Sequence, residues 1–390
     1  MMSIGLHKKA VASFDRCLMA NDGDNNDGAP DGGVYVFDVD CLSDRSAIVA
    51  STSDNYLSLY DSETLNQIRK MKVHTEMING FDLSKGSPNL IFTASNDHRI
   101  YGWDLRTSGD VPIIKLKFAD DVTAISVGIS DTLIAAGCGS AISFYDIRGG
   151  DNWTTGKKST KLGEYSDIHT DAITQLKFSR ANSQILVSGA EDGLISIFNT
   201  SAADGDDAVV SILNAECPVR RLGFFGCDDE ALYCLSTTET ASFWHCATAQ
   251  RVGDFPNVRE ELAVDYLVDC MYDNYSDCLS VIAGNYDGTA KIAVVEPTSL
   301  RITGELTLGG HSATVRCGKY VSSSSGRARL ITGGEDATVC SWYLDSGAAE
   351  SSMSNTDGPT SSVGQKSNNG PTMKSTGGPA KKVERRQKPY

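Results

Sequence analysis

Three stretches of the chain repeat one pattern, and this repetition limits the folds that the sequence can adopt. They read FTASNDHRIYGWD at residues 92–104, VSGAEDGLISIFN at 187–199 and ITGGEDATVCSWY at 331–343. In each stretch an acidic residue lies six positions before a large aromatic residue, Trp or Phe, which is the second-last residue of the stretch. Repetition at intervals of about 20–50 residues is typical of proteins that stack copies of one unit, because a single unit cannot bury its own apolar face.

The position of this large residue marks seven units along the chain, and successive markers are 43, 42, 53, 46, 49 and 49 residues apart. This spacing is close to the period of about 40–45 residues that a four-stranded propeller blade requires. Within the fourth unit, short alternating or β-branched runs are separated by turn residues, as in ITQLKF (173–178) and QILVSGA (184–190). The markers are Tyr60, Trp103, Tyr145, Phe198, Trp244, Ala293 and Trp342.

The sequence therefore predicts an all-β fold, a single seven-bladed propeller over residues 1–345 with very little helix. The seventh unit ends after its third strand, at residues 342–345. Its fourth strand must then come from the N-terminus, within residues 5–15. A ring closed in this way leaves no sheet edge exposed.

A set of four polar and aromatic positions recurs at similar offsets in units two, four and seven. A buried carboxylate is costly unless donors fill its lone pairs, and imidazole, hydroxyl and indole groups can serve as those donors. The pattern resembles the WD-repeat family of β-propellers, in which these positions form a hydrogen-bonded network inside each blade. The resemblance implies a structural role for three sets of residues: His74, Thr93, Asp97 and Trp103; His169, Ser188, Asp192 and Phe198; and His311, Thr332, Asp336 and Trp342.

Longer stretches are similar to the WD repeat-containing protein 89 family. The similarity is carried by residues 169–199, by VDYLVDCMYDNYSDCLSVIAGNYDG at 264–288 and by GGHSATVRC at 309–317. It covers most of residues 34–345. That family has no well-defined activity, so the resemblance implies a fold without naming a function.

Charge is unevenly distributed along the chain. The whole chain carries −15, while residues 346–390 hold seven Lys and Arg against three Asp and Glu, which leaves −19 for the rest. Such a body repels nucleic acids and anionic membranes, so we expect neither as a direct partner. It favours other proteins, preferentially through basic segments.

Two stretches superficially resemble ligand-binding loops. NDGDNNDGAPDGG at 21–33 lacks the Gly and Glu of a calcium loop, with Asp27 and Gly33 in their places, and is interpreted as a flexible acidic loop. GGDNWTTGKK at 149–158 has five residues, not four, between the glycines of a phosphate loop. Motifs for a nucleophile beside a base are also missing, so we expect no enzyme activity, cofactor or metal.

Two arginines suggest a docking site. Arg106 in WDLR and Arg148 in YDIR follow the third strands of adjacent units. The pattern resembles the one by which some propellers dock onto the adaptor of a cullin-type ubiquitin ligase. The alternative is that both residues only cap blade turns.

The C-terminal residues 346–390 are rich in Ser, Gly and Pro and predict a disordered tail. This segment ends in the basic sequence KKVERRQK at 381–388, for which three interpretations are open. It could act as a nuclear import signal, keep the protein in solution, or contact the acidic body of the same chain. With no signal segment and no apolar run of about 20 residues, we expect a cytoplasmic or nuclear protein that is not secreted.

The function that these observations favour is a non-catalytic scaffold for protein–protein interactions. One alternative is a substrate receptor of a cullin ligase that docks through Arg106 and Arg148. Another is an acidic escort for a basic nuclear or ribosomal protein.

Overall fold

The computed structural model describes residues 5–13, 33–148, 159–202, 205–306, 310–321 and 328–345. The chain divides into one compact unit that ends at Ala348 and a second unit, Ala349–Tyr390. Most of the predicted acidic loop at 21–33, the connection at 149–158 and the predicted tail with its basic end lie outside the described residues.

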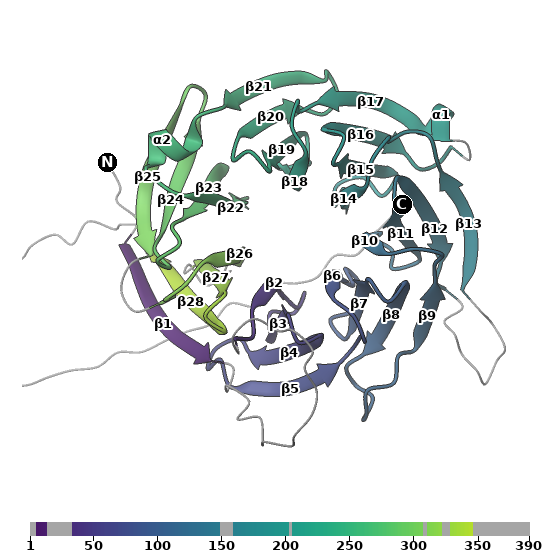
Figure 1. Ribbon diagram of the computed structural model, residues 1–390, viewed down its shortest axis with the longest axis horizontal. Coiled ribbons are helices and arrows are strands. Elements are labelled where there is room, and N and C mark those ends of the chain that lie inside the picture. The colour runs from purple at the N-terminus through teal and green to yellow at the C-terminus, as the bar shows by residue number, and fades with distance from the viewer. Residues whose placement is uncertain are drawn as a thin grey trace, which may run out of the picture. The chain divides into compact units, whose positions relative to one another are not determined.

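Seven four-stranded antiparallel sheets surround a common centre, which confirms the predicted all-β propeller (Figure 1). Chain order numbers the blades, and in each of the first six blades the first strand is innermost and the fourth is outermost. Blade 1 contains β2 (Val36–Cys41), β3 (Ala47–Thr52), β4 (Tyr56–Asp61) and β5 (Gln67–Lys72); blade 2 contains β6 (Ile78–Leu83), β7 (Leu90–Ser95), β8 (Arg99–Asp104) and β9 (Ile114–Lys117); blade 3 contains β10 (Val122–Val127), β11 (Leu133–Cys138), β12 (Ala141–Asp146) and β13 (Thr160–Tyr165); blade 4 contains β14 (Ile173–Phe178), β15 (Ile185–Ala190), β16 (Leu194–Asn199) and β17 (Val209–Asn214). Blade 5 contains β18 (Val219–Phe225), β19 (Ala231–Ser236), β20 (Ala241–His245) and β21 (Gln250–Phe255); blade 6 contains β22 (Tyr266–Asp273), β23 (Cys278–Gly284), β24 (Ala290–Glu296) and β25 (Ser299–Leu306); blade 7 contains β26 (Val315–Val321), β27 (Ala328–Gly334), β28 (Thr338–Asp345) and β1 (Gly5–Ser13).

The first strand of the chain completes the last blade. Strand β1 runs antiparallel to β28, with Gly5 opposite Asp345 and Ser13 opposite Thr338. The prediction that a strand within residues 5–15 closes the ring is therefore confirmed. Figure 1 shows β1 on the perimeter beside β28, where the other blades place their own fourth strands.

Apolar clusters between neighbouring blades hold the ring together. Between blades 3 and 4, for example, Ile142 and Phe144 of β12 pack with Ile173 and Leu176 of β14. Of the seven marker residues that define the repeat units, six are buried and Tyr145 is half-buried. The repeated sequence positions are therefore core positions, and each marker packs against the preceding blade of the ring.

All seven inner strands contain a β-bulge near their start. The pairing register shifts by one residue at this point in each of the seven strands, so one residue is left outside the ladder. A bulge bends a strand locally and re-aims the side chains beside it. The bulged residues are Phe37, Asn79, Thr123, Thr174, Arg220, Val268 and Arg316.

The two faces of the ring are formed by different connections. We call the face at which the inner strands begin the entry face. Antiparallel order places the connections between blades there, together with the turns between second and third strands. The opposite face carries the turns between first and second strands and those between third and fourth strands.

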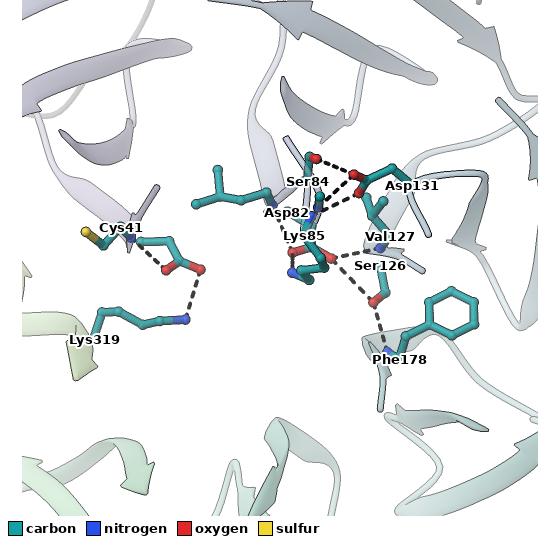
Figure 2. Close-up of polar contacts among 12 residues, drawn as sticks. Cys41, Asp82, Ser84, Lys85, Ser126, Val127, Asp131, Phe178 and Lys319 are labelled. Carbon is teal, nitrogen blue, oxygen red and sulfur yellow. Dashed lines mark hydrogen bonds and ion pairs between the residues drawn. The ribbon is translucent and has the colours of Figure 1, made fainter. Parts of the chain in front are cut away.

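Turns on the opposite face are fixed by aspartates from the following blade. Asp131 in blade 3 accepts hydrogen bonds from Ser84 Oγ (2.6 Å) and from the backbone N–H of Gly86 (2.8 Å) in blade 2 (Figure 2). Asp229 in blade 5 does the same for Ser179 Oγ (2.9 Å) in blade 4. Both aspartates have positive φ angles, 53° and 54°, which Asp tolerates better than most residues. These bonds couple neighbouring blades.

In the part of the chain that the structure describes, helix is confined to two short segments, α1 (Gly205–Ala208) and α2 (Val258–Leu262). Segment α2 lies in the connection between blades 5 and 6 and ends at Ala263 in the left-handed conformation. Neither helix of the described chain has the length and apolar character to cross a membrane.

Candidate functional site

In blade 2, the structure brings the four predicted network residues together. His74 Nδ1 lies 2.9 Å from Asp97 Oδ2, and His74 Nε2 lies 2.7 Å from Thr93 Oγ. The Trp103 indole donates to Thr93 Oγ (3.0 Å), and not to the carboxylate as the sequence suggested. A single direction of donation fits these contacts, from Trp103 through Thr93 to His74, whose Nδ1–H then reaches Asp97. Burial lowers the pKa of His74, which favours the neutral imidazole that this arrangement requires.

Blade 4 has the same arrangement but lacks the indole donor. His169 Nε2 lies 2.6 Å from Ser188 Oγ, and His169 Nδ1 lies 3.1 Å from Asp192 Oδ2. Phe198 is fully buried but has no N–H, so the chain of hydrogen bonds begins at the serine.

Blade 7 repeats the complete arrangement of blade 2. His311 Nε2 lies 2.8 Å from Thr332 Oγ, and Trp342 Nε1 donates to the same oxygen at 2.9 Å. His311 Nδ1 lies 3.1 Å from Asp336 Oδ1. The three networks lie inside blades, so their histidines are structural groups in this geometry.

The central channel contains charged side chains that the sequence analysis missed. In four of the seven inner strands, a charged residue occupies the position three residues after the bulge. Lys319 Nζ in blade 7 lies 2.9 Å from Asp40 Oδ2 in blade 1 (Figure 2). Burial alone would raise the pKa of Asp40, but the adjacent Lys319 ammonium lowers it overall. Aligning the seven inner strands would have revealed this position, whose residues are Asp40, Asp82, Ser126, Lys177, Gly223, Met271 and Lys319.

Some of these side chains satisfy the free edge of the next inner strand. Asp82 Oδ2 accepts from the backbone N–H of Val127 (2.8 Å), and Asp82 Oδ1 accepts from Lys85 Nζ (2.6 Å) (Figure 2). Ser126 Oγ accepts from the N–H of Phe178 (3.0 Å) in the same way. An inner strand has no sheet partner on its channel side, so these contacts supply acceptors that water would otherwise provide.

An ion pair spans the channel. Arg221 in blade 5 and Asp38 in blade 1 approach to 4.0 Å, although β18 and β2 lie on opposite sides of the ring in Figure 1. Burial alone would lower the pKa of Arg221, but Asp38 and Asp269 raise it overall, so the guanidinium stays charged. Tyr233 Oη donates to Asp269 at 3.0 Å. The middle of the channel is therefore occupied by paired charges.

The contribution of Asp82 to stability should depend on pH. Burial alone would raise its pKa, but Lys85 and Lys177 lower it overall. A depressed carboxyl pKa stabilises the folded state above the unfolded pKa of about 3.9, and this stabilisation is lost as the pH falls through the folded value. We expect Asp82→Asn to lower the melting temperature at pH 6, and the difference from wild type to shrink as the pH falls below about 4.

Circular dichroism melts of both proteins between pH 3 and pH 7 would measure this difference. Asp228→Asn, which changes an exposed carboxylate on the opposite face, is the control. A difference between wild type and Asp82→Asn that stays constant over this range would show that the charge of Asp82 is not the cause.

A cavity of about 580 Å³ opens where the channel meets the entry face. Four of its lining residues are bulged residues of inner strands, which explains how side chains from separate blades converge there. We call this space the mouth cavity. It is lined by Phe37, Asn79, Gln175, Arg220, Arg221, Tyr266, Tyr286, Thr314, Val315, Arg316 and Glu335.

Two arginines of the mouth cavity are held in different ways. Arg316 Nε donates to Glu335 Oε1 (2.8 Å), and its guanidinium lies 5.6 Å from the ring centre of Phe37. Arg220 donates through one terminal nitrogen to the carbonyl of Leu267 (2.5 Å) and to Glu239 Oε2 (3.3 Å). Its Nε is buried and has no hydrogen-bond partner among the described residues.

The two predicted docking arginines lie outside the mouth cavity, on the opposite face. Arg106 follows β8, Arg148 follows β12, and their side chains are 66% and 70% exposed. Arg106 donates to both carboxylate oxygens of Asp104, two residues earlier, and Arg148 does the same with Asp146. Local pairing thus orients each guanidinium while leaving it accessible.

One surface group could offer three ligand atoms to a metal ion. His98, Asp120 and Asp121 place these atoms within 4.8 Å of one another on the entry face. His98 and Asp121 are both 46% exposed. A structural zinc site usually has four ligands in a closed shell, so this exposed group does not form one.

Comparisons with known proteins agree with this architecture. The family model described as "WD domain, G-beta repeat" matches residues 161–199 and 304–343. The WD repeat-containing protein GTS1 of Arabidopsis thaliana is 30% identical over 337 residues, which cover 82% of this chain and 83% of that protein. The WD repeat-containing protein 89 homolog of Dictyostelium discoideum is 27% identical over 326 residues, with 81% and 84% covered.

A solved structure supports the fold alone. The crystal structure of the computationally designed Ika8 protein matches with a TM-score of 0.58 and 16% identity, covering 80% of this chain and 97% of that one. Repeated networks, sheet topology and sequence similarity lead to the same conclusion: this chain belongs to the WD-repeat family of β-propeller proteins and is related to WD repeat-containing protein 89.

Proposed function

We propose that this protein is a non-catalytic scaffold that binds basic segments of other proteins on its entry face. WD-repeat propellers generally act as scaffolds for protein interactions and are generally not catalysts. A closed ring of blades offers preformed surfaces, and a preformed surface lowers the ordering cost of binding. The choice of a basic partner rests on the charge of the entry face.

The connections of the entry face are strongly acidic. Among the described residues, the connections between blades contain nine Asp or Glu, and the turns between second and third strands contain eight, three of which are the buried network aspartates Asp97, Asp192 and Asp336. Arg259 is the only Lys or Arg in the described parts of these segments. The described turns of the opposite face are mixed, with ten acidic residues against five basic ones. A basic segment would therefore be attracted to one face in particular.

Charge neutralisation of each face tests this proposal. The entry-face variant combines Glu76→Gln, Asp120→Asn, Asp171→Asn and Glu191→Gln, all at exposed positions. The matched variant of the opposite face removes the same four charges from exposed positions, with Glu63→Gln, Asp206→Asn, Asp207→Asn and Asp228→Asn. Fluorescence anisotropy would compare basic, neutral and acidic peptide pools at two salt concentrations.

We expect wild type to bind the basic pool best and to lose affinity as salt rises. The entry-face variant should bind that pool at least about tenfold more weakly, which corresponds to about 1.4 kcal/mol. The opposite-face variant should stay close to wild type. Equal losses in both variants, or a preference for the neutral pool, would contradict the proposal.

A ligase receptor is the second candidate, because two exposed and oriented arginines lie at equivalent turns of adjacent blades. If the protein is a ligase receptor, the double variant Arg106→Ala/Arg148→Ala should no longer bind a purified cullin-ligase adaptor. The control variant Arg180→Ala, on the same face, should bind the adaptor as wild type does. Binding of the adaptor by wild type and the double variant alike would reject it. The escort alternative requires salt-sensitive binding of basic proteins that does not depend on these two arginines.

A further inference from the structure

The lining of the mouth cavity is richer in cationic side chains than the face around it. Arg220, Arg221 and Arg316 line it beside the carboxylate of Glu335, whereas the ion-pair partners of the first two, Glu239 and Asp38, lie outside the lining. The surrounding connections carry the acidic residues described above. A basic segment that crosses the entry face would therefore meet favourable charge around the rim but cationic groups at the centre.

Arg220 has donors that make no hydrogen bond to the described residues. Its Nε is buried without a partner among them, and only one terminal nitrogen makes the bonds to Glu239 and Leu267. A buried donor of a charged group is costly when it is unsatisfied, and such groups in native structures call for an explanation. A guanidinium presents its donors in a planar fork that matches the two oxygens of a carboxylate. Because the Arg220 side chain lines the mouth cavity and is 31% exposed, a carboxylate there would reach the exposed part of this guanidinium.

The rest of the cavity suits a short side chain on a peptide. Tyr286 is 68% exposed, and its ring centre lies 5.5 Å from that of Tyr266, so the two rings form an aromatic wall. Phe37 lies on the other side of Arg316, which is 42% exposed. Aromatic rings provide rigid contact area at low entropic cost, and the arginine between them provides charge.

We propose that the mouth cavity binds the carboxylate of a single Asp or Glu within an otherwise basic segment of a partner protein. The proposal rests on the proposed function, since the basic flanks would lie on the acidic rim. Opposite charges at the centre and the rim would fix the register of the segment, because a shift by a few residues places like charges together.

The test uses three labelled peptide pools that differ at one position. Each pool is basic and aromatic in composition, with Glu, Gln or phosphoserine fixed at the centre. Wild type should bind the Glu pool about tenfold more tightly than the Gln pool, as expected for a charge-assisted bidentate contact. Arg316→Gln and Arg220→Gln should each bring this ratio close to one while leaving binding of the Gln pool unchanged. Arg316→Lys should keep part of the preference.

Controls separate this proposal from the proposed function. Arg301→Gln on the outer strand β25 removes an exposed arginine far from the mouth cavity in the sheet order and should leave the ratio unchanged. The entry-face variant should weaken binding of the Glu and Gln pools equally and keep their ratio. If Arg220→Gln does not fold, the binding ratio of Arg316→Gln still tests the carboxylate site. The Arg316 side chain is partly exposed, so its replacement should leave the fold intact.

Each outcome supports or overturns one statement. Equal binding of the Glu and Gln pools by wild type would overturn the carboxylate site. A preference that survives in Arg316→Gln would place the site elsewhere. Tighter binding of the phosphoserine pool than of the Glu pool would assign the mouth cavity to a phosphate and overturn the carboxylate assignment.

Discussion

Deletion of residues 1–13 is expected to lower the melting temperature by roughly 10 °C or more and to make the protein self-associate. The deletion removes β1 and leaves β28, from Thr338 to Asp345, as a free sheet edge. An unpaired edge presents backbone donors and acceptors that can pair with another chain. Thermal melts with size-exclusion chromatography and light scattering would measure both effects.

Two controls separate ring closure from a general effect of truncation. Deletion of Ala349–Tyr390 removes only the second unit and should leave the melting temperature unchanged. A synthetic peptide of residues 1–16 should restore a monomer when added to the protein that lacks residues 1–13, and a scrambled peptide should not. A monomeric truncated protein with the melting temperature of wild type would show that β1 contributes little to stability.

Thr93→Val should destabilise the protein by about 2–5 kcal/mol. Valine has nearly the same shape but cannot accept the hydrogen bond of the Trp103 indole or donate to His74. Thr93 is 0% exposed, so both partners would stay buried with unsatisfied groups, each costing about 1–3 kcal/mol. Urea denaturation followed by tryptophan fluorescence and circular dichroism would give the change.

Blade 4 provides a matched comparison for this prediction. Ser188→Ala removes the same hydroxyl, but only His169 loses a partner, since Phe198 has no N–H to leave unsatisfied. We expect about half the loss seen for Thr93→Val, and less than about 0.5 kcal/mol for Thr248→Val on an exposed turn. Equal losses at Thr93 and Ser188 would show that the indole hydrogen bond adds nothing.

The blades could be predicted because their signals are local. A strand is marked by alternation over about six residues, and a network by offsets within one unit, so both can be counted along the chain. The third-strand markers and the closing strand followed from the same count. The acceptor of the indole hydrogen bond could not be predicted in this way, because the offsets place Trp103, Thr93 and Asp97 in one unit without showing which oxygen the indole reaches.

The mouth cavity could not be predicted because its residues come from different units. Phe37, Arg220 and Arg316 are far apart in the sequence, and only the geometry of the closed ring brings them together. Their convergence also depends on a bulge in each inner strand, which carries no characteristic residue: the bulged positions include aromatic, amide, hydroxyl, aliphatic and cationic side chains. The net charge predicted an acidic body but not which face carries the acidic connections, and an average over the chain conceals the three arginines that gather in the mouth cavity.

The pairing of Gly5 with Asp345 also has a consequence in time. A ribosome makes the first strand early and its partner only after more than three hundred further residues. At roughly 5–20 residues per second, β1 waits about 20–60 seconds before the last blade exists. During that interval the growing chain has an unpaired strand at one end and an incomplete ring at the other. Chaperone binding to nascent chains should therefore be strongest shortly before residue 345 leaves the exit tunnel, and should end with closure.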